Sequence, residues 1–597
     1  MNAITIDKEA LKQKYAEERD KRLRGDGSAQ YVRLESEFSD LATDPYTALK
    51  ERDPVTDHVT FAFIGGGFAG LVVGARLKEA GIDDVRIIEK GGDFGGTWYW
   101  NRYPGAQCDT ASMIYMPLLE ETGHMPSEKY AHAPEIRDHC SRIGNHFGLY
   151  EHALFHTEVE DLEWDAAKKV WIVSTNRGDA FTAKYVGMGT GPLHVAKLPG
   201  LPGIEDFKGK AFHTSRWDYD YTGGNPEGAP LDKLADKRVA IIGTGATAVQ
   251  CIPHLARSAK ELLVFQRTPS SVDRRDNAPI EQDWFSDVAE EGWQRKWQEN
   301  FAANLGVGFP EEDLVNDGWT DLAKRVRANL KEVPPSEWTP EKMLASFEDS
   351  DFQKMEEIRQ RAAELVEDPD TGEKLKAWYR QLCKRPCFHD EYLQAFNQPA
   401  TRLIDTDGKG AERITEKGVY AAGQEYEVDC IVYASGFEVS VDYVSRAGFD
   451  VTGKGGRKLS EHWEEGMRTK HGLHMAGFPN AFMVQPTQAA NFIANVPHNI
   501  VDHADTIAAI VSHAEKQGSD TVEVTADAEQ AWIEFLQTGL GVNIGNTECT
   551  PGYYNNEGAG WGERDRFMLG HPHGAVAFFN YMDGWRKSGE FEGLEFG

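Results

Sequence analysis

Residues 58–81 read HVTFAFIGGGFAGLVVGARLKEAG, and this stretch decides the fold. An apolar run, a glycine turn and a second apolar run with helical spacing predict a buried strand, a tight turn and a helix. Residues 85–90, VRIIEK, predict the next parallel strand. The pattern Gly65-x-Gly67-x-x-Gly70 lets the chain turn tightly, approach a pyrophosphate closely and pack the helix against the strand. The stretch therefore predicts the first βαβ unit of a dinucleotide-binding domain.

The same pattern returns about 180 residues later. Residues 237–259, KRVAIIGTGATAVQCIPHLARSA, again predict a strand, a turn and a helix, and residues 261–267, ELLVFQR, predict the following strand. The second fingerprint is Gly243-x-Gly245-x-x-Ala248, with alanine in place of the third glycine, which the motif tolerates. Two such openings predict an α/β protein with two Rossmann-like dinucleotide-binding domains rather than an array of short repeats.

The two fingerprints differ at the residue that selects the nucleotide. Glu89 follows Gly70 by 19 residues, and Arg267 follows Ala248 by the same 19. An acid at this position accepts hydrogen bonds from a ribose 2′-hydroxyl, whereas an arginine neutralises a 2′-phosphate, here with Thr268 beside it. The simplest pair of nucleotides is FAD in the first site and NADPH in the second, which predicts redox chemistry.

The composition narrows the class of protein. The 597 residues include 64 basic and 96 acidic ones, and the net charge of −32 argues against nucleic acid or an anionic membrane as a partner. No apolar run approaches the roughly 20 residues that span a bilayer, and the N-terminus lacks the pattern of a signal peptide. The seven cysteines are irregularly spaced and form no CxxC pair. This pattern predicts a reducing compartment, the cytoplasm, with neither a disulfide framework nor a metal site.

Changes in composition and hydrophobic pattern along the chain predict the domain boundaries. Residues 7–24 predict a surface helix of a polar arm that packs on the main body, with a partner-binding arm as the alternative. Residues 428–437, VDCIVYASGF, predict a buried strand with which the chain returns to the first domain. We therefore divide the chain into an N-terminal extension (1–57), the first part of the FAD domain (58–190), the first part of the NADP domain (191–270), a helical insertion in the NADP domain (271–381), the second part of the NADP domain (382–427), and the second part of the FAD domain with a C-terminal loop (428–597).

Two nucleotide domains alone leave glutathione-reductase-like disulfide enzymes, N-hydroxylases and other flavoproteins open. Two longer motifs distinguish among these classes. Residues 95–109 read GGTWYWNRYPGAQCD, and the segment before the second fingerprint contains Phe207-x-Gly209-x-x-x-His213-x-x-x-Trp217-Asp218. Together these motifs resemble the signatures of the Baeyer–Villiger monooxygenases, flavoproteins that insert oxygen next to a ketone carbonyl. The resemblance spans residues 58–510 and has both fingerprints in the family's order.

The resemblance implies roles for particular residues. Lys384-Arg385-Pro386 corresponds to the family's Lys-Arg-Pro, so that Arg385 reaches the flavin, Lys384 helps to bind the 2′-phosphate, and Asp109 pairs with the arginine. A fixed cation there would stabilise the peroxide and the negative oxygen of the addition intermediate. The linker residues Phe207, Gly209, His213, Trp217 and Asp218 would coordinate domain movement rather than perform chemistry. The complete set of expected cofactor contacts is Gly65, Gly67, Phe68, Ala69, Gly70, Glu89, Lys90, Gly96, Thr97, Trp98, Asp109 and Tyr115 for FAD, and Gly243, Thr244, Gly245, Ala246, Thr247, Ala248, Arg267, Thr268 and Lys384 for NADPH.

The activity implied is conversion of a ketone to an ester or lactone with NADPH and O2, through a C4a-peroxyflavin, by a monomer or homodimer. The alternatives are a monooxygenase acting on nitrogen or sulfur, and a non-catalytic flavin redox sensor that signals through the N-terminal arm. Residues 549–558, CTPGYYNNEG, have tyrosines where many family members carry a tryptophan on a mobile loop. This difference and the long N-terminal arm are typical of the subgroup that acts on bulky or macrocyclic ketones. Cys383 and Cys387, on either side of Lys384-Arg385-Pro386, are expected to pack rather than to react.

Overall fold

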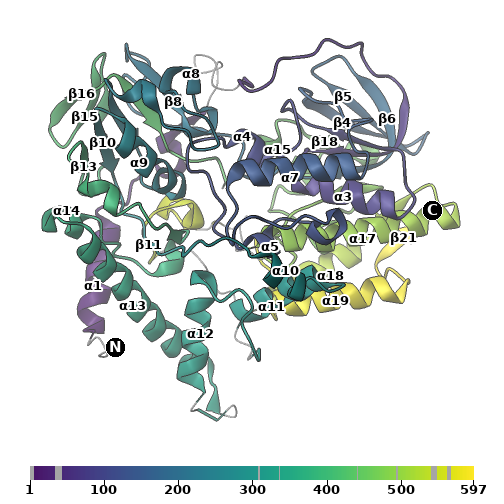
Figure 1. The fold of residues 1–597 in the computed structure, drawn as a ribbon. Coiled ribbons are helices and arrows are strands. Elements are labelled where there is room, and N and C mark those ends of the chain that lie inside the picture. The colour runs from purple at the N-terminus through teal and green to yellow at the C-terminus, as the bar shows by residue number, and fades with distance from the viewer. Residues whose placement is uncertain are drawn as a thin grey trace.

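The structure of the protein is a computed structural model that describes residues 6–33, 43–306, 310–331, 333–334, 337–439, 442–491, 495–539, 548–560, 562 and 567–597. Two sheet-based domains stand side by side, with a group of helices below them (Figure 1). The first domain is built on a seven-stranded sheet in the order β18-β4-β5-β6-β2-β3, with β19 also paired to β6. Its strands are β2 (His58–Ile64), β3 (Val85–Ile88), β4 (Val159–Asp165), β5 (Val170–Thr175), β6 (Ala180–Met188), β18 (Val451–Thr452) and β19 (Ala481–Met483).

The predicted first βαβ unit forms as expected. β2 runs parallel to both β3 and β6, and the glycine turn leads into α3 (Phe68–Glu79). Phe61 and Phe63 of β2 are fully buried because helices cover the sheet, and α17 (Val496–Gln517) packs along α3. The C-terminal helices α18 (Ala526–Gln537) and α19 (Ala575–Ser588) lie on the same side (Figure 1), so the last part of the chain returns to the first domain.

The second domain contains a five-stranded, fully parallel sheet in the order β13-β10-β9-β17-β8. Its glycine turn joins β9 to α9 (Ala246–Ser258), which confirms the second βαβ unit. The strands are β8 (Lys210–His213), β9 (Arg238–Ile242), β10 (Glu261–Gln266), β13 (Thr401–Asp405) and β17 (Cys430–Tyr433).

The boundary that we set at residue 428 is wrong, because β17 belongs to the second sheet and not to the first. Cys430, Ile431, Val432 and Tyr433 are almost fully buried and are hydrogen-bonded between β9 and β8. An apolar parallel strand of this kind requires a neighbour on each side and cover on both faces. The chain passes back to the first sheet only after Phe437, and it pairs there at β18.

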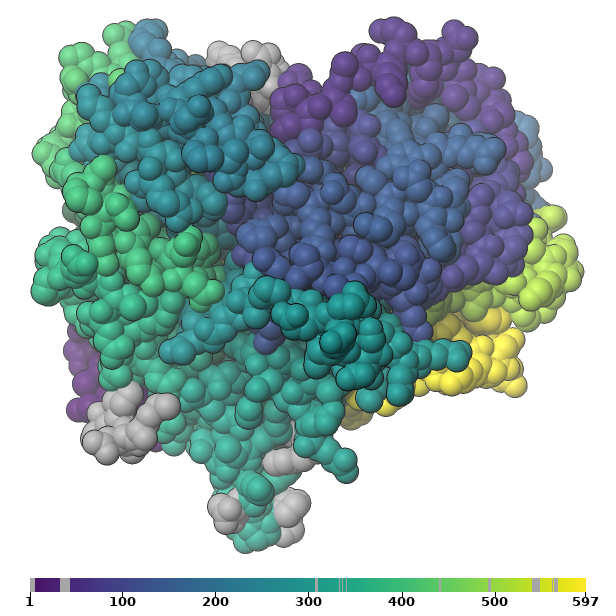
Figure 2. Space-filling view, in the orientation of Figure 1, coloured from purple at the N-terminus to yellow at the C-terminus, as the bar shows by residue number. Residues whose placement is uncertain are grey.

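The insertion is helical, as predicted, but it contacts both domains. Its helices are α10 (Gln282–Val288), α11 (Trp293–Leu305), α12 (Gly318–Leu330), α13 (Pro340–Leu365) and α14 (Pro369–Lys374). Trp293, Trp297 and Phe301 of α11 join the core of the first domain, whereas Ala362 of α13 joins that of the second. Figure 2 shows this insertion in teal beneath both domains.

The N-terminal arm packs on the main body. Tyr15 of α1 (Lys8–Asp20) lies edge-on to Phe352 of α13, with ring centroids 6.0 Å apart, and its hydroxyl accepts a hydrogen bond from Arg359 at 3.0 Å. Further along, β1 (Tyr31–Arg33) pairs with β7 (Lys197–Pro199) beside the second nucleotide domain. This part of the arm therefore lies next to the predicted NADPH site.

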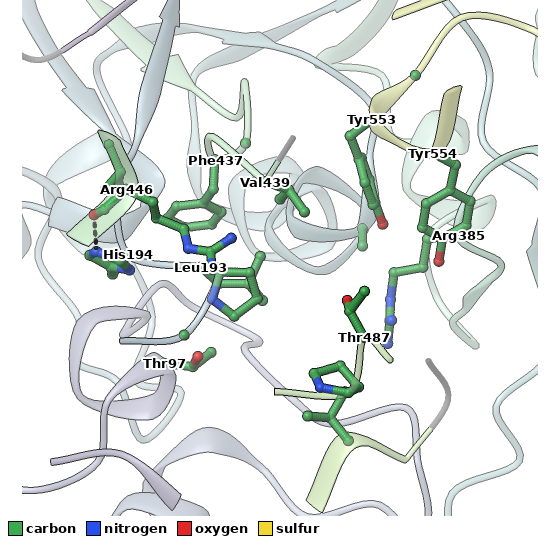
Figure 3. A pocket seen from close by; sticks show the side chains of 18 of the residues that line it. Thr97, Leu193, His194, Arg385, Phe437, Val439, Arg446, Thr487, Tyr553 and Tyr554 are labelled. Atoms are coloured by element: carbon green, nitrogen blue, oxygen red, sulfur yellow. Dashed lines mark hydrogen bonds between the residues drawn. The ribbon is translucent and has the colours of Figure 1, made fainter. Parts of the chain in front are cut away.

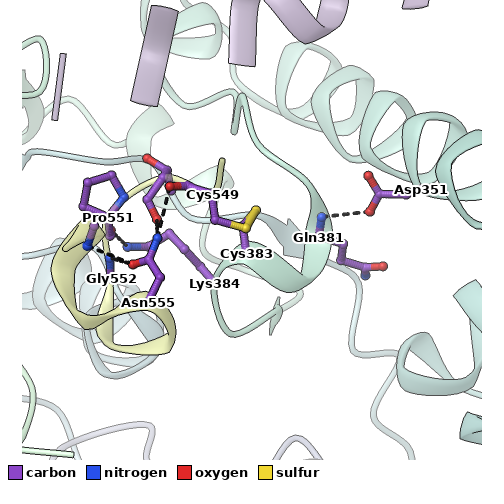
Figure 4. The surroundings of a disulfide bond; sticks show 10 residues. Asp351, Gln381, Cys383, Lys384, Cys549, Pro551, Gly552 and Asn555 are labelled. Carbon is purple, nitrogen blue, oxygen red and sulfur yellow. Dashed lines mark hydrogen bonds between the residues drawn. A yellow bond between two sulfur atoms is a disulfide. The ribbon is translucent and has the colours of Figure 1, made fainter. Parts of the chain in front are cut away.

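The structure corrects the expectation that the cysteines form no disulfide and that Cys383 only packs. Cys383 forms a disulfide with Cys549, 166 residues further along the chain, with Cα atoms 5.1 Å apart (Figure 4). Cys387 is a free, buried thiol, as expected. The disulfide ties the segment before Arg385 to the base of the C-terminal loop, a proximity that only the tertiary structure creates.

Within the described ranges, no helix has the length and apolar character needed to cross a membrane. The same residues contain no group of three or more His, Cys, Asp or Glu side chains arranged to hold a metal ion.

Candidate active site

A continuous cavity of 3410 Å³ connects the two nucleotide domains. Its walls include both glycine turns, Arg385 and the C-terminal loop around Tyr553. Pockets for one small ligand typically measure about 300–1,000 Å³. The cavity is therefore large enough for two nucleotides and a substrate together.

The first glycine turn leaves no room for side chains. A Cβ atom on Gly65, whose φ is +110°, would lie 2.5 Å from the carbonyl oxygen of Gly189. A Cβ on Gly96 would lie 2.8 Å from the Cα of Gly67, so these two backbones face each other across the start of α3. The amide groups at a helix start form an anion site, and this close backbone approach fits a pyrophosphate.

Glu89 lies at the end of β3 and is 5% exposed. Its two carboxylate oxygens accept hydrogen bonds from the backbone N–H of Gly91 at 2.7 Å and of Gly66 at 2.6 Å. Burial raises the pKa of this carboxyl, although both backbone donors oppose the change. Each oxygen retains a second lone pair, and the residue lines the cavity, so Glu89 fits the predicted contact with a ribose hydroxyl.

The second glycine turn has the same construction. A Cβ on Gly243 would lie 2.6 Å from the carbonyl oxygen of Ala434. Ala434 thus occupies the position that Gly189 occupies in the first domain. A Cβ on Gly245 would meet nothing within 4 Å, because this glycine opens on the cavity at the start of α9. Thr244 closes the turn by donating to the carbonyl oxygen of Thr268 at 2.7 Å.

Most of the predicted cofactor contacts do face the cavity. The exceptions are Gly70 and Ala248, the third positions of the two fingerprints, which pack helix against strand. The predicted residues that line the cavity are Gly65, Gly67, Phe68, Ala69, Glu89, Lys90, Gly96, Thr97, Trp98, Asp109, Tyr115, Gly243, Thr244, Gly245, Ala246, Thr247, Arg267, Thr268, Lys384 and Arg385.

A cluster of cations lies at the end of β10. Arg267 stands there with Lys197 and Lys384, and Glu557 of the C-terminal loop lies among them. Burial lowers the pKa of Lys384 to about 8, an effect that Glu557 partly offsets. The Lys384 ammonium donates to the carbonyl oxygen of Pro551 at 3.0 Å, which places it against the same loop (Figure 4).

Arg385 and Asp109 form an ion pair in the wall of the cavity. A guanidinium nitrogen of Arg385 lies 2.5 Å from Oδ1 of Asp109. Burial disfavours the charge on Arg385, but Asp109, together with Tyr553, Tyr554 and Cys387, outweighs this and holds the pKa of the guanidinium well above its usual value. The open 32% of the Arg385 side chain faces the cavity, where it is free to donate to a ligand. A permanently charged donor is thus fixed between the two nucleotide turns.

Trp319 of the insertion supports this pair and was not predicted. Its indole N–H donates to the carbonyl oxygen of Asp109 at 2.8 Å, and its ring lies 5.4 Å from the Arg385 guanidinium carbon. No local motif marks Trp319, because its role depends on a helix of one domain reaching the other. The one local signal is Asp317, two residues earlier, which caps α12 and so marks where the helix that carries Trp319 begins.

The C-terminal loop brings two tyrosines to the same place. Figure 3 shows Tyr553 and Tyr554 beside Arg385, with Thr487 between them and the wall formed by Leu193 and Phe437. The two tyrosine rings pack edge to face with centroids 4.6 Å apart. The loop thus closes one side of the space in front of Arg385.

The linker motif lies outside the cavity wall. His213 is fully buried, its pKa is lowered to about 3 by burial, and its Nδ1 pairs with the Ser215 hydroxyl at 2.8 Å. The buried Trp217 donates to the Thr222 hydroxyl at 3.0 Å, and Asp218 caps the short helix α8 (Tyr219–Thr222). These contacts fit a structural role in the connection between domains rather than direct chemistry.

Comparison with known proteins agrees with this geometry. Residues 62–290 match the family model described as pyridine nucleotide-disulphide oxidoreductase. A Baeyer–Villiger monooxygenase from Streptomyces coelicolor is 47% identical over 585 residues, which cover 97% of this chain and 95% of that protein. The polycyclic ketone monooxygenase from Thermothelomyces thermophila superposes with a TM-score of 0.92, at 37% identity and 99% coverage of both chains. The structure of OTEMO in complex with FAD and NADP gives a TM-score of 0.72, at 26% identity, and covers 90% of this chain and 99% of that one.

Fold and site define a two-nucleotide flavoprotein oxidoreductase. Within that class, the chain belongs to the Baeyer–Villiger monooxygenase family, which confirms the resemblance found in the sequence. It is an NADPH-dependent flavin monooxygenase that converts ketones to esters or lactones, and the comparisons favour this activity over nitrogen or sulfur oxidation and over a redox sensor.

Proposed function

We propose that this protein oxidises bulky, polycyclic ketones, with FAD held at the first glycine turn and NADPH at the second. The single observation that carries the proposal is the Arg385–Asp109 pair, which faces a cavity shared by both turns. The size of the cavity supports a large substrate, and so does the name of the polycyclic ketone monooxygenase with the TM-score of 0.92.

FAD, when bound, supplies the oxidation chemistry by taking electrons from NADPH and activating O2. The protein supplies charge and position. Arg385 places a permanent positive charge where negative charge develops on the carbonyl oxygen of an attacked ketone, and such preorganised charge lowers the barrier. Asp109 fixes the direction of the guanidinium fork, and Trp319 fixes the backbone of Asp109.

The second site holds the reductant through its phosphates. The start of α9 would hold the pyrophosphate, and Arg267, Thr268 and Lys384 would bind the 2′-phosphate. Lys384 and Arg385 are adjacent in sequence, so the residue assigned to cofactor choice is joined directly to the residue assigned to catalysis. The locations of the linker residues support a role in transmitting domain movement. A cytoplasmic location and a monomeric or homodimeric state remain predictions from the sequence.

Replacing Arg385 tests the proposal. In Arg385→Ala we expect NADPH still to reduce the flavin, while ester or lactone formation falls by at least about a hundredfold, as for loss of a group that stabilises transition-state charge. Arg385→Lys retains the charge without the planar fork and should recover part of the rate. The measurement is product mass with labelled O2 across ketones from cyclohexanone to steroids. Unchanged ester formation in Arg385→Ala would contradict the assignment, and a preference for cyclohexanone would contradict the substrate class.

A further inference from the structure

The carboxylate of Glu557 lies in the cation cluster to which we assign the 2′-phosphate of NADPH. Its Oε2 is 3.4 Å from a guanidinium nitrogen of Arg267, and its Oε1 is 3.6 Å from the Lys197 ammonium. Glu557 is only 5% exposed. Both distances exceed the roughly 2.7–2.9 Å of a strong charge-assisted hydrogen bond. The protein thus places a weakly held negative group where a stronger anion is expected.

The cluster holds more positive charge than Glu557 neutralises. Lys197, Arg267 and Lys384 are all close to the carboxylate, and burial is the main reason why the pKa of Lys384 falls to about 8. A fourth cation, Arg22, is already paired with Glu18 at 2.7 Å. Buried cations require partners, and a dianionic phosphate would balance this cluster better than one carboxylate does.

The fork of Arg267 is occupied at both ends. One guanidinium nitrogen donates to the side-chain oxygen of Gln30 from the N-terminal arm, and the other faces Glu557. Each of these nitrogens keeps a second N–H group, so a phosphate can still bind the fork, but it would do so beside the Glu557 carboxylate. Glu557 is the partner that a dianion would repel, whereas the neutral Gln30 is not repelled.

The backbone at Glu557 is held in an unusual form. Asn556 and Glu557 have φ of +50° and +55°, the left-handed region that non-glycine residues seldom adopt and that costs energy. Surrounding contacts hold this form: the Ser28 hydroxyl donates to Asn556 at 2.8 Å, and the Asn555 side chain accepts from two backbone N–H groups of the loop, at 3.0 and 3.1 Å. Glu557 is thus part of a constrained turn in the loop that carries Tyr553 and Tyr554, so its displacement would disturb that loop.

We propose that Glu557 is a specificity residue that competes with the 2′-phosphate of NADPH for Arg267 and Lys197. A nucleotide with a 2′-phosphate displaces Glu557 and frees the loop beside Arg385, whereas NADH lacks the group that would do so. The choice of cofactor is thereby linked to the wall of the ketone site. This inference rests on the proposed position of the 2′-phosphate.

The first test measures affinity in the FAD-loaded, full-length enzyme by calorimetry, with 2′,5′-ADP as the probe and ADP as the ligand without a 2′-phosphate. Glu557→Gln keeps the shape and removes the charge, so we expect 2′,5′-ADP to bind about three- to tenfold more tightly, the scale of one removed like-charge contact. ADP should bind as before. Glu557→Asp, which keeps the charge, should stay within about twofold of the parent enzyme. Structural damage would weaken binding, so a gain distinguishes competition from misfolding.

Two further variants separate the possible failures. Asp26→Asn also removes a negative charge near Arg267, but Asp26 is exposed and pairs with Arg24 at 2.6 Å, so we expect no gain. Arg267→Ala tests the phosphate site itself and should weaken 2′,5′-ADP binding. If Arg267→Ala weakens binding and Glu557→Gln does not strengthen it, Glu557 is no competitor and the inference fails alone. If Arg267→Ala has no effect, the proposed phosphate site fails as well.

The second test follows the loop itself. Hydrogen exchange of residues 549–558 should rise when 2′,5′-ADP is added to the parent enzyme, and it should already be high in Glu557→Gln without the probe. ADP should leave it unchanged in both proteins. Equal exchange in the parent enzyme with and without 2′,5′-ADP would overturn the link between phosphate and loop.

Discussion

Asp109→Asn isolates the contribution of one carboxylate to the active-site arginine. The change preserves shape and leaves one oxygen to accept from Arg385, but it removes the charge that lies 2.5 Å from the guanidinium. Breaking a buried ion pair costs about 3–5 kcal/mol, and a charge-assisted hydrogen bond contributes about 1.5–3 kcal/mol. Since an acceptor remains and Arg385 opens on the cavity, we use the lower range, about 1.5–3 kcal/mol, for the loss of transition-state stabilisation. This corresponds to a fall in kcat/KM for the ketone of about 10- to 150-fold.

The assay compares ketone-dependent product formation with the rate at which NADPH reduces the flavin. We expect the rate of product formation to fall and the rate of flavin reduction to change little, so that more NADPH is consumed for each product molecule. Asp179→Asn is the matched control, because Arg52 and Asp179 form an ion pair of the same 2.5 Å length, with Asp179 fully buried and both residues outside the cavity wall. The Asp179→Asn variant should lose stability but form as much product for each NADPH consumed as the parent enzyme does. If Asp109→Asn and Asp179→Asn behave alike, Asp109 has only a structural role and our reasoning is refuted.

Three further predictions concern the segment around Arg385 and the disulfide that holds it. Because burial lowers the pKa of Lys384 to about 8, its charge is lost as the pH rises through 8, whereas a bound phosphate favours the charged form. Affinity for 2′,5′-ADP should therefore be level between about pH 7 and 8, where the phosphate is dianionic, and fall above pH 8 by up to about tenfold per pH unit. Lys384→Met should abolish that fall. In denaturant without reductant, thiol titration should find five free cysteines of the seven, because Cys383 and Cys549 are joined, and seven would contradict the bond. Cys549→Ser should lower the free energy of unfolding by about 2–5 kcal/mol in a denaturant titration, as for other long disulfide loops.

The features that the sequence predicted correctly depend on local chemistry. A glycine such as Gly65, with φ of +110°, is required by the turn itself, and the buried strand before it follows from its own apolar residues. Gly70 and Ala248 are the exceptions: they were expected to contact the cofactors, but they lie outside the cavity wall and pack helix against strand, as the third position of the motif does. Glu89 and Arg267 could be placed because each follows its strand directly.

The features that the sequence did not reveal depend on which distant segments meet. The apolar residues of β17 predict a buried strand equally well in either sheet, and only its pairing with β9 and β8 decides between them. Cys383 and Cys549 are 166 residues apart, and no spacing rule connects them. Trp319 reaches Asp109 from the insertion, on an element that the dinucleotide motifs do not describe.

The contacts that the sequence did not predict gather around the active-site arginine and the nucleotide-selecting arginine, where they can affect substrate choice and cofactor binding. The two nucleotide turns are complete within their own domains, but the side chains that support the two arginines come from segments outside both βαβ units. Trp319 of the insertion supports the Arg385–Asp109 pair, whereas Glu557 of the C-terminal loop and Gln30 of the N-terminal arm contact Arg267. Segments of this kind tolerate change more readily than the turns, because no pyrophosphate fixes their backbone. If substrate choice and cofactor release are set there, exchanging residues 549–558 between relatives should alter ketone preference and NADPH affinity together, while FAD binding stays constant. Separate responses of the two properties would show that the loop serves only one of them.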